Sequence, residues 1–365
     1  IFADTPISIS SEVVPEMQEY ERTETTVVNS YVRPEVETYV NNLQQALGDR
    51  MGADTLLSIL RSDGGLASAR AAAESPVNLL MSGPAGGVSG AIYFCSRAGF
   101  DDILTFDMGG TSTDVALIQN SRARVRRETI VGDVRVRAPS VDVRTVGAGG
   151  GSICHVNQGE LEVGPASAGS EPGPICYGRG GTRPTITDAL LMLGILADTS
   201  EFAGGSFALT REGVEQAFQT IGDEMGYSAE DAAVDCWRMV NANMSQGVRR
   251  ITAGKGIDPA DMCMLAYGGN GPAFAAIQAE DLGIDRVLVP KASPAFSALG
   301  TLVADPSIDE ERSYIVPADR VDIDRLKARY DNRDLILCCK RLVFPIPHHR
   351  ADMAGRKEAI HAHIG

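Results

Sequence analysis

The ten residues from Phe106 to Val115 constrain the fold of this chain more than any other segment. They read Phe-Asp-Met-Gly-Gly-Thr-Ser-Thr-Asp-Val and lie between two apolar runs, Ile103-Leu-Thr and Ala116-Leu-Ile. Glycines at the junction of two such runs are typical of a tight β-hairpin. A hairpin is a different setting from the P-loop and the dinucleotide fingerprint, which both join a strand to a helix.

The residue types in this hairpin predict a phosphate site. Gly109 and Gly110 carry no side chains, so their backbone N–H groups can approach a phosphate closely. Asp107 and Asp114 are placed to hold a hydrated Mg2+ beside that phosphate. An alternative for Asp114 is that it only holds the turn by accepting backbone N–H bonds. We expect Asp107 to be an exposed loop residue outside the core. Three hydroxyls complete the hairpin: Thr111, Ser112 and Thr113.

Composition limits the classes of function. The chain has 365 residues, enough for one large or two medium domains. It carries 33 basic and 48 acidic residues, a net charge of −15, which argues against nucleic acid as a partner. No apolar run approaches the roughly 18 residues that a membrane span needs, so we expect no membrane association. Seven scattered cysteines are typical of reduced thiols, which favours a cytoplasmic location.

The first hundred residues predict alternating elements. We expect a short strand, a helix and a strand within residues 1–60, with Pro34 in the first turn of the helix. A helix is expected over 65–75 and a strand over 77–82. The glycines between Gly83 and Gly87 should end that strand, and an apolar helix should follow from Val88 to Ala98.

The remainder alternates strands, glycine-rich loops and helices. Residues 164–184 are expected to be loop, and Thr187 with Asp188 should cap a helix that starts at Ala189. A cleft carboxylate is the alternative for Asp188. The other expected elements are strands over 134–146 and 265–267, the longest helix over 228–254, a helix after Pro272, a strand over 287–290 and a small-residue helix within 293–303.

Two further glycine clusters are candidate binding loops. Gly147–Ser152 resembles a dinucleotide fingerprint, but Ile153 continues a strand-like sequence, which favours a tight loop at a cleft rim. Contact with nucleotide or substrate is the alternative for this loop. The second cluster opens a helix, and a helix N-terminus favours a phosphate or a stacked base. Its predicted nucleotide contacts are Gly268, Gly269, Asn270 and Gly271.

Metal-ligating and nucleophilic patterns are weak. Cys154, His155 and Cys176 match no zinc spacing, so structural thiols and a surface histidine are favoured. The same holds for the group formed by Cys338, Cys339, His348 and His349. No Ser–His–Asp or Cys–His arrangement names a general base. Phosphoryl transfer needs chiefly positioning and charge neutralisation, so this is no objection to it.

The order of these elements resembles the second lobe of the superfamily of sugar kinases, actin and seventy-kilodalton heat-shock chaperones. Within that superfamily, the sequence motifs are similar to those of the ATP-dependent N-methylhydantoinase A and 5-oxoprolinase family. That family includes subunits of acetone and acetophenone carboxylases. The resemblance covers roughly residues 5–310. It rests on Glu19-Tyr-Glu-Arg-Thr23, Ser62-Asp-Gly-Gly65, Ser82-Gly-Pro-Ala-Gly-Gly87, Phe106-Asp-Met-Gly-Gly-Thr111, Val146-Gly-Ala-Gly-Gly-Gly-Ser152, Gly173-Pro-Ile-Cys-Tyr-Gly-Arg-Gly-Gly181 and Pro184-Thr-Ile-Thr-Asp188.

The resemblance implies an α/β, ribonuclease-H-like actin/sugar-kinase ATPase fold, mainly the second lobe with part of the first. Residues 1–98 would be the remainder of the first lobe, 99–310 the second lobe with the phosphate and adenosine motifs, and 311–365 an uncertain C-terminal segment. Family members carry a second Asp-x-Gly-Gly-Thr motif near the N-terminus, whereas this chain has one copy and begins at Ile1. We therefore expect that an upstream part is not included.

The resemblance also implies a function. ATP and Mg2+ would activate a carbonyl oxygen by phosphorylation, with Asp107 as the catalytic residue. A cyclic amide such as hydantoin or 5-oxoproline is the first choice of small-molecule substrate, and ketone carboxylation is the second. The alternative from a different class of function is a non-catalytic binding module that is switched by ATP. A second, hydantoinase B-like subunit is the expected partner, and the chain alone is expected to be inactive.

Overall fold

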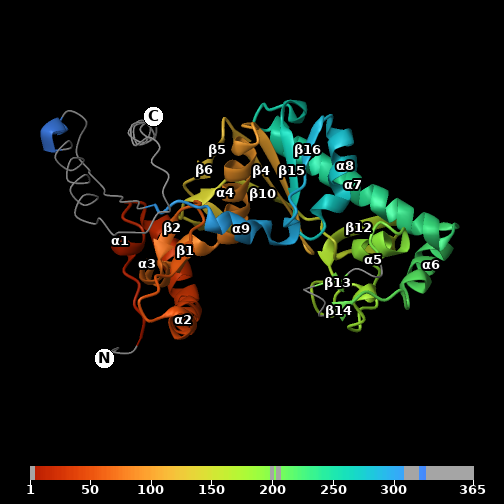
Figure 1. Cartoon of the computed structure of the whole chain (residues 1–365), viewed down its shortest axis with the longest axis horizontal. Coiled ribbons are helices and arrows are strands. Elements are labelled where there is room, and N and C mark those ends of the chain that lie inside the picture. Colours follow the sequence, from red (N-terminus) through yellow and green to blue (C-terminus); the bar gives the residue numbers. More distant parts are fainter. Residues whose placement is uncertain (1–4, 198–200, 203–206, 308–319, 326–365) are drawn as a thin grey trace. The chain divides into compact units, whose positions relative to one another are not determined.

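The computed structural model describes residues 5–197, 201–202, 207–307 and 320–325. The chain divides into two units, residues 1–312 and 313–365, and every element discussed below belongs to the first (Figure 1). The cysteine and histidine group near the C-terminus, residues 338–349, lies outside the described residues. Within the described part, no helix is long and apolar enough to cross a membrane.

A six-stranded sheet forms the centre of this unit, with the strand order β10-β4-β3-β15-β16 and β5 paired to β4. β3 and β4 form the predicted antiparallel hairpin, and β10 extends it on the β4 side. β15 and β16 run parallel to β3. The strands are β3 Ile103–Met108, β4 Thr113–Gln119, β5 Arg122–Ala123, β10 Val143–Val146, β15 Cys263–Tyr267 and β16 Arg286–Leu288.

Helices cover both faces of the sheet. Successive side chains of a strand point to opposite faces, and β3 and β4 carry apolar side chains on each face that must be buried. On one face, Phe106 and Met108 share a core with Met244 of α7 (Ala229–Ala253) and Phe274 of α8 (Gly271–Leu282). On the other face, Ile103 packs with α4 (Ser82–Arg97) and α9 (Phe296–Leu302). The predicted helices at 228–254 and after Pro272 are confirmed.

The crossing of α4 and α9 requires glycine. A Cβ placed on Gly300 would lie 1.8 Å from the backbone oxygen of Gly86. This close approach explains why α4 has glycine at positions 86 and 90 inside the helix, although glycine weakens an isolated helix. The predicted strand over 77–82 is wrong, since Pro76–Leu79 forms a 3-10 turn, η1, and the helix starts directly afterwards.

The N-terminal region is more helical than predicted. The expected opening strand is wrong, because α1 (Ser10–Val13) and the long α2 (Glu19–Met51) precede β1 (Ser58–Leu60). Pro34 lies inside α2 and not in its first turn. The predicted helix over 65–75 forms only from Ala69 to Glu74, as α3, after the short strand β2 (Leu66–Ser68).

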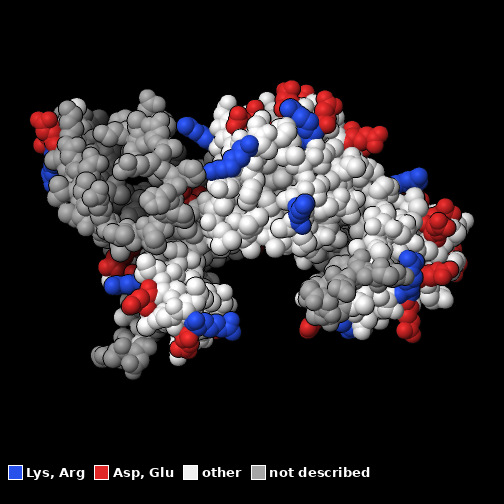
Figure 2. Space-filling view, viewed as in Figure 1, with Lys and Arg blue, Asp and Glu red and all other residues white. Residues whose placement is uncertain are grey.

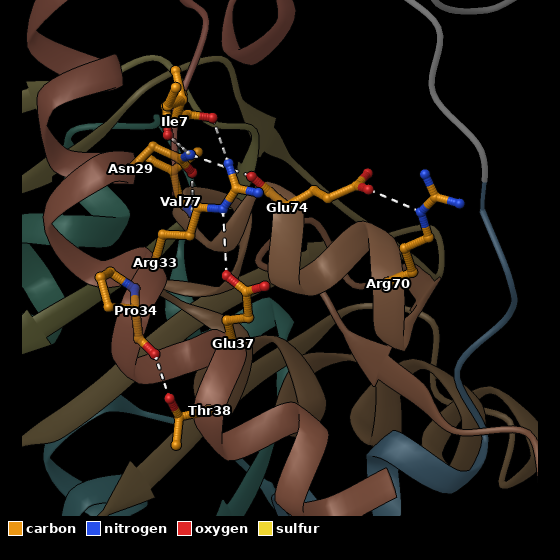
Figure 3. A network of polar contacts seen from close by, with 10 residues as sticks. Ile7, Asn29, Arg33, Pro34, Glu37, Thr38, Arg70, Glu74 and Val77 are labelled. Carbon is orange, nitrogen blue, oxygen red and sulfur yellow. Dashed lines mark hydrogen bonds and ion pairs between the residues drawn. The ribbon is translucent and has the colours of Figure 1, made fainter. Parts of the chain in front are cut away.

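Figure 3 shows the polar contacts that hold α2 on the N-terminal side of Pro34. The fully buried Asn29 accepts a hydrogen bond from the backbone N–H of Val77 at 3.2 Å and donates to the backbone oxygen of Glu74 at 3.3 Å. Arg33 donates to the backbone oxygen of Ile7 at 2.7 Å. These tertiary contacts stabilise the helix on the N-terminal side of Pro34, where a proline by itself predicts a helix boundary.

Residues 152–225 form a region of small sheets and helices inserted between β10 and α7, and α7 reaches α5 and α6 of this region (Figure 1). The loop predicted over 164–184 contains some regular secondary structure, because Gly164–Ser167 belongs to β12 and Ile175–Tyr177 forms the 3-10 turn η2. The elements are β11 Ser152–Asn157, β12 Glu160–Ser167, η2, α5 Ile186–Met192, β13 Glu201–Phe202, β14 Phe207–Ala208 and α6 Val214–Met225.

Short strands replace the continuous alternation predicted over 134–146. β8 (Val134–Val136) pairs with β7 (Thr129–Val131), and β9 (Ser140–Val141) pairs with β6 (Val125–Arg126). Figure 2 shows that, on the face drawn, basic and acidic side chains of the described residues stand singly or in small groups. That face carries no extended basic band.

Candidate functional site

The two predicted carboxylates lie side by side at the end of the hairpin. Asp107 of β3 and Asp114 of β4 are direct cross-strand partners, so their side chains share one face of the sheet. Thr145 of β10 is the next residue across from Asp114, and Tyr267 of β15 is the next across from Asp107. The sheet therefore aligns Tyr267, Asp107, Asp114 and Thr145 in one row.

The surroundings of this row make both carboxyl groups weaker acids. Burial raises the pKa of Asp107 to about 6, and the nearby charge of Asp114 adds to the effect. A weak hydrogen bond from Ser297 Oγ, 3.5 Å from Asp107 Oδ2, acts in the opposite direction. Burial also raises the pKa of Asp114, against the hydrogen bond from Thr145 Oγ1 at 2.6 Å. Asp114 thus accepts from the neighbouring strand and does not hold the turn through backbone N–H groups.

The donor set fits a hydrated Mg2+. Among the described residues, neither Asp107 nor Asp114 forms an ion pair with a basic side chain, so two adjacent carboxylates have no cation to offset them. No group of three or more His, Cys, Asp or Glu is placed to share a metal in the described parts of the chain. Mg2+ commonly keeps several waters and binds one or two carboxylates together with substrate phosphates. Asp107 and Asp114 could hold it in that way.

The tip of the hairpin presents bare backbone to open space. The N–H of Gly109 donates to the backbone oxygen of Ser112 at 3.0 Å and closes the turn. A Cβ on Gly110 would meet nothing within 4 Å, so the backbone of Gly110 is accessible, whereas the N–H of Gly109, also predicted to face a phosphate, is used within the turn. Thr111 is exposed and Ser112 half-buried, whereas Thr113 is fully buried and donates to the backbone oxygen of Ala148 at 2.7 Å. Its hydroxyl therefore cannot serve a ligand.

The Gly147–Ser152 loop packs against this hairpin. The N–H of Gly150 donates to the backbone oxygen of Gly109 at 3.1 Å, and the N–H of Gly151 donates to that of Gly110 at 2.5 Å. Thr187, which sequence reasoning did not place here, donates through Oγ1 to the backbone oxygen of Gly150 at 2.9 Å. The loop therefore supports the hairpin from one side, as the reading of a tight loop predicts.

The second glycine cluster supports the hairpin from another side. Gly268 has a positive φ of 84°, and a Cβ there would lie 2.5 Å from Asp107 Oδ1. Asn270 donates its backbone N–H to Met108 O at 3.0 Å and its Nδ2 to Gly109 O at 3.2 Å. Because α8 begins at Gly271, its N-terminus lies directly after this contact. A Cβ on Gly269 would meet nothing within 4 Å.

Two other sequence candidates are placed elsewhere. Asp188 is fully buried at the third position of α5, whose N-cap is Thr185, and it accepts N–H bonds from Cys176 at 2.7 Å and Ile175 at 3.2 Å. It fixes η2 against α5 and is not a cleft carboxylate. Its predicted capping role is confirmed at the third position of the helix instead of at the N-cap, because it accepts the N–H of Thr185 at 2.9 Å and completes a capping box. Cys154 and Cys176 are buried free thiols, and burial raises the pKa of both.

Sequence reasoning missed Thr145 and Ser297 as neighbours of the carboxylates. They are 31 and 190 residues from the aspartates to which they donate. The available signals were the alternation of residues 143–146, which places Thr145 on one face of a strand, and the small-residue motif that contains Ser297. Neither signal identifies the partner.

Comparison with known proteins shows the family to which this chain is related. The family model described as hydantoinase/oxoprolinase matches residues 22–310. This chain belongs to the hydantoinase/oxoprolinase family. It is 38% identical to the caprolactamase subunit alpha of Pseudomonas jessenii, over 88% of the chain and 47% of that subunit. It is 34% identical to the 5-oxoprolinase of Saccharomyces cerevisiae, over 82% of the chain and 24% of that enzyme.

Solved structures agree with the family. A nucleotide-free structure of acetone carboxylase, from a study of ATP-dependent acetone carboxylation, matches with a TM-score of 0.76 at 30% identity, over 88% of the chain and 46% of its own. The ATP-dependent caprolactamase of P. jessenii matches with a TM-score of 0.73 at 36% identity, over 91% and 48%. The predicted actin-like ATPase fold is confirmed. The chain spans about half the length of these relatives or less, and the lobe boundary at residue 98 stays a prediction.

Proposed function

We propose that this chain is the nucleotide-binding part of an ATP-dependent amidohydrolase that acts on a cyclic amide of the hydantoin or 5-oxoproline type. The observation that carries the proposal is the adjacent, half-buried pair Asp107 and Asp114 at the base of an open glycine turn. The identity to a caprolactamase subunit and to a 5-oxoprolinase, both named for cyclic amides, favours this substrate class.

Each part of the site has a separate task in this proposal. The backbone N–H of Gly110, with Thr111 and Ser112, receives the phosphates, since the N–H of Gly109 already closes the turn. The loop from Gly268 to Gly271 and the N-terminus of α8 stabilise negative charge and the adenosine beside them. Asp107 and Asp114 hold Mg2+ through water.

ATP would transfer its terminal phosphoryl group to the amide carbonyl oxygen and leave as ADP. Water would then add to that carbon and the C–N bond of the ring would break, which releases the amine and leaves an acyl phosphate. A second water would hydrolyse the acyl phosphate to the carboxylate and inorganic phosphate. Asp107 has the central role among the residues of this chain. Its carboxylate is the one next to both the hairpin and Gly268, and it must be ionised to hold a cation. Because burial raises the pKa of Asp107 to about 6, cation binding should weaken as the pH falls below that value.

A ketone carboxylase subunit is the second candidate. The acetone carboxylase structure has the higher TM-score of the two reported above, 0.76 against 0.73. Both activities start from activation of a carbonyl oxygen, so the site on this chain serves either one. A non-catalytic module switched by ATP remains the third candidate, and substrate-dependent ATP hydrolysis separates it from the other two.

The proposal includes a partner and a location. The caprolactamase relative is named as a subunit, which supports a second subunit here, and we propose that it is hydantoinase B-like. A single Asp-x-Gly-Gly-Thr motif lines only one side of the phosphates, so the chain alone should not turn over ATP. The five cysteines that the structure describes are free thiols, and we propose a cytoplasmic location.

The test is a substrate panel on the protein assembled with its partner subunit. ATP hydrolysis is measured with hydantoin, 5-oxoproline and caprolactam, and then with acetone or acetophenone plus bicarbonate. Stimulation by a cyclic amide, lost in Asp107→Asn, supports the first proposal, whereas stimulation only by a ketone with bicarbonate supports the second. ATP turnover that no substrate changes, or robust turnover by the chain alone, contradicts the proposal.

A further inference from the structure

A cavity of about 570 Å³ opens between β10 and the C-terminal half of α7. β10 is the end strand of the central sheet, so this side of it has no neighbouring strand in the described structure. The strand contributes Arg144, Thr145 and Val146 to the lining. The helix contributes Asn243, Gln246 and Arg250. Lys255, just beyond the end of α7, completes the basic part of the wall.

The cavity adjoins the nucleotide site but includes none of its predicted contacts. None of the hairpin residues 107–114 and none of the residues 268–271 line it. Neighbouring side chains of a strand point to opposite faces. Thr145 therefore directs its hydroxyl to Asp114, whereas Val146 faces α7, where it contacts the position of Gly247. The two sites meet at Thr145, which lines the cavity and donates to Asp114, and at Gly147, which belongs to the loop that supports the hairpin.

The charged residues that line the cavity are all basic. Arg144, Arg250 and Lys255 contribute to the wall and no Asp or Glu does, although the whole chain has a net charge of −15. One carboxylate, Asp142, lies beside the cavity with 8% of its surface exposed. Its negative charge offsets one of these three positive charges and leaves an excess for a ligand.

Asp142 positions two of the basic groups. Its Oδ2 lies 2.6 Å from Lys255 Nζ, and its Oδ1 lies 3.2 Å from Arg144 Nε and 3.8 Å from Arg126 Nε. Burial alone would raise the pKa of Asp142, but the hydrogen bond and charge of Lys255, with the two arginines, hold it below its usual value. Asp142 thus stays ionised and keeps Lys255 and Arg144 at the wall before any ligand arrives.

The helix side offers polar groups that are not used within the chain. Asn243, Gln246 and Arg250 are exposed, and their side chains make no hydrogen bond or ion pair with another residue in the described part of the protein. They are spaced three and four residues apart, so they lie along one face of α7. An arginine and two amides on one face form a set of donors for oxyanions.

We propose that this cavity binds a small dianion, either a phosphate monoester or a dicarboxylate, between Arg144 and Arg250. The volume is in the range of small-molecule sites, about 300–1,000 Å³. Arg144, held by Asp142, contributes a fixed positive charge, and Arg250 contributes the free guanidinium that closes on the ligand. Asn243 and Gln246 donate to the remaining oxygen atoms.

The test is calorimetric titration of the folded chain with methyl phosphate and, separately, with succinate. The variant Arg250→Gln removes the free charge from an exposed position and should not disturb folding, which circular dichroism checks. Arg238→Gln is the matched control, because Arg238 is an exposed arginine of the same helix outside the cavity. Arg250→Lys restores the charge without the planar fork.

We expect one of the two anions to bind the wild type and Arg238→Gln equally, and Arg250→Gln to bind it about tenfold more weakly, or about 1.4 kcal/mol. Arg250→Lys should recover part of the loss, and added salt should weaken binding. The anion that binds identifies the ligand class. Absence of saturable binding of both anions at millimolar concentration, or binding that Arg250→Gln leaves unchanged, overturns the proposal. None of the three substitutions touches the hairpin, so failure here leaves the proposed function standing.

Discussion

Replacement of Asp107 by Asn should make the protein more stable and less active. Contrary to the sequence-based expectation, Asp107 is not an exposed loop residue but a half-buried residue of β3. Burial and the charge of Asp114 raise its pKa from 3.8 to about 6. The folded protein therefore keeps a carboxylate in a place that disfavours its charge, and Asn has a nearly identical shape without that charge.

The size of the effect follows from linkage. The interval between 3.8 and about 6, at about 1.4 kcal/mol for each pKa unit, corresponds to about 3 kcal/mol. Asp107 retains partial access to solvent, so we expect about 2–3 kcal/mol. A raised carboxyl pKa means that stability is fully present below pH 3.8 and is lost as the pH rises to about 6. The advantage of Asp107→Asn should therefore be near zero at pH 4 and complete above pH 6.5.

The assay is urea unfolding of the wild type and Asp107→Asn between pH 4 and 8. Asp285→Asn is the control, because Asp285 is an exposed aspartate between α8 and β16 and should show no such difference. In the assembled enzyme, ATP turnover of Asp107→Asn should fall by roughly 10²–10³, the scale for losing one preorganised electrostatic contact. Equal stability of wild type and variant at pH 7.5, or a difference that does not change with pH, would refute the reasoning.

Three further substitutions test individual contacts. Thr145→Val removes the hydroxyl that donates to Asp114, so the pKa of Asp114 should rise further and ATP affinity, measured by calorimetry with Mg2+, should fall about tenfold. Gly300→Ala places a methyl group 1.8 Å from the backbone oxygen of Gly86 and should lower the free energy of unfolding by about 1–3 kcal/mol in urea. Asp188→Asn replaces a buried acceptor of several N–H bonds, so it should lower the free energy of unfolding by about 2 kcal/mol or more. It should also accelerate hydrogen exchange in η2, and unchanged exchange would contradict the structural role of Asp188.

Local chemistry determined the parts of the site that could be predicted. Two apolar runs with glycines between them specify a hairpin, because a turn and its flanking strands interact over a few residues. The same local logic located the N-terminus of α8 after Gly268 and the long helix α7. The two aspartates of the hairpin, Asp107 and Asp114, were predicted beside the phosphate by their residue type, and the register of the hairpin makes them cross-strand partners.

Tertiary structure decided the features that depend on distant partners. α4 is helical through Gly86 and Gly90 where these glycines pack against Gly300, and α2 continues through Pro34 where Asn29 and Arg33 bind other segments. Local propensity predicts a boundary at both places, since it contains no information about these contacts.

The electrostatics of the site have the same origin. The pKa of Asp107 rises because folding buries it and pairs it with Asp114, and Ser297, which is 190 residues away, modifies it. The basic cavity likewise exists only because β10 and α7 come together and Asp142 orders two of its cations. The sequence by itself determined which chemical groups are available, whereas burial and long-range pairing determined their pKa values, their partners and the space around them.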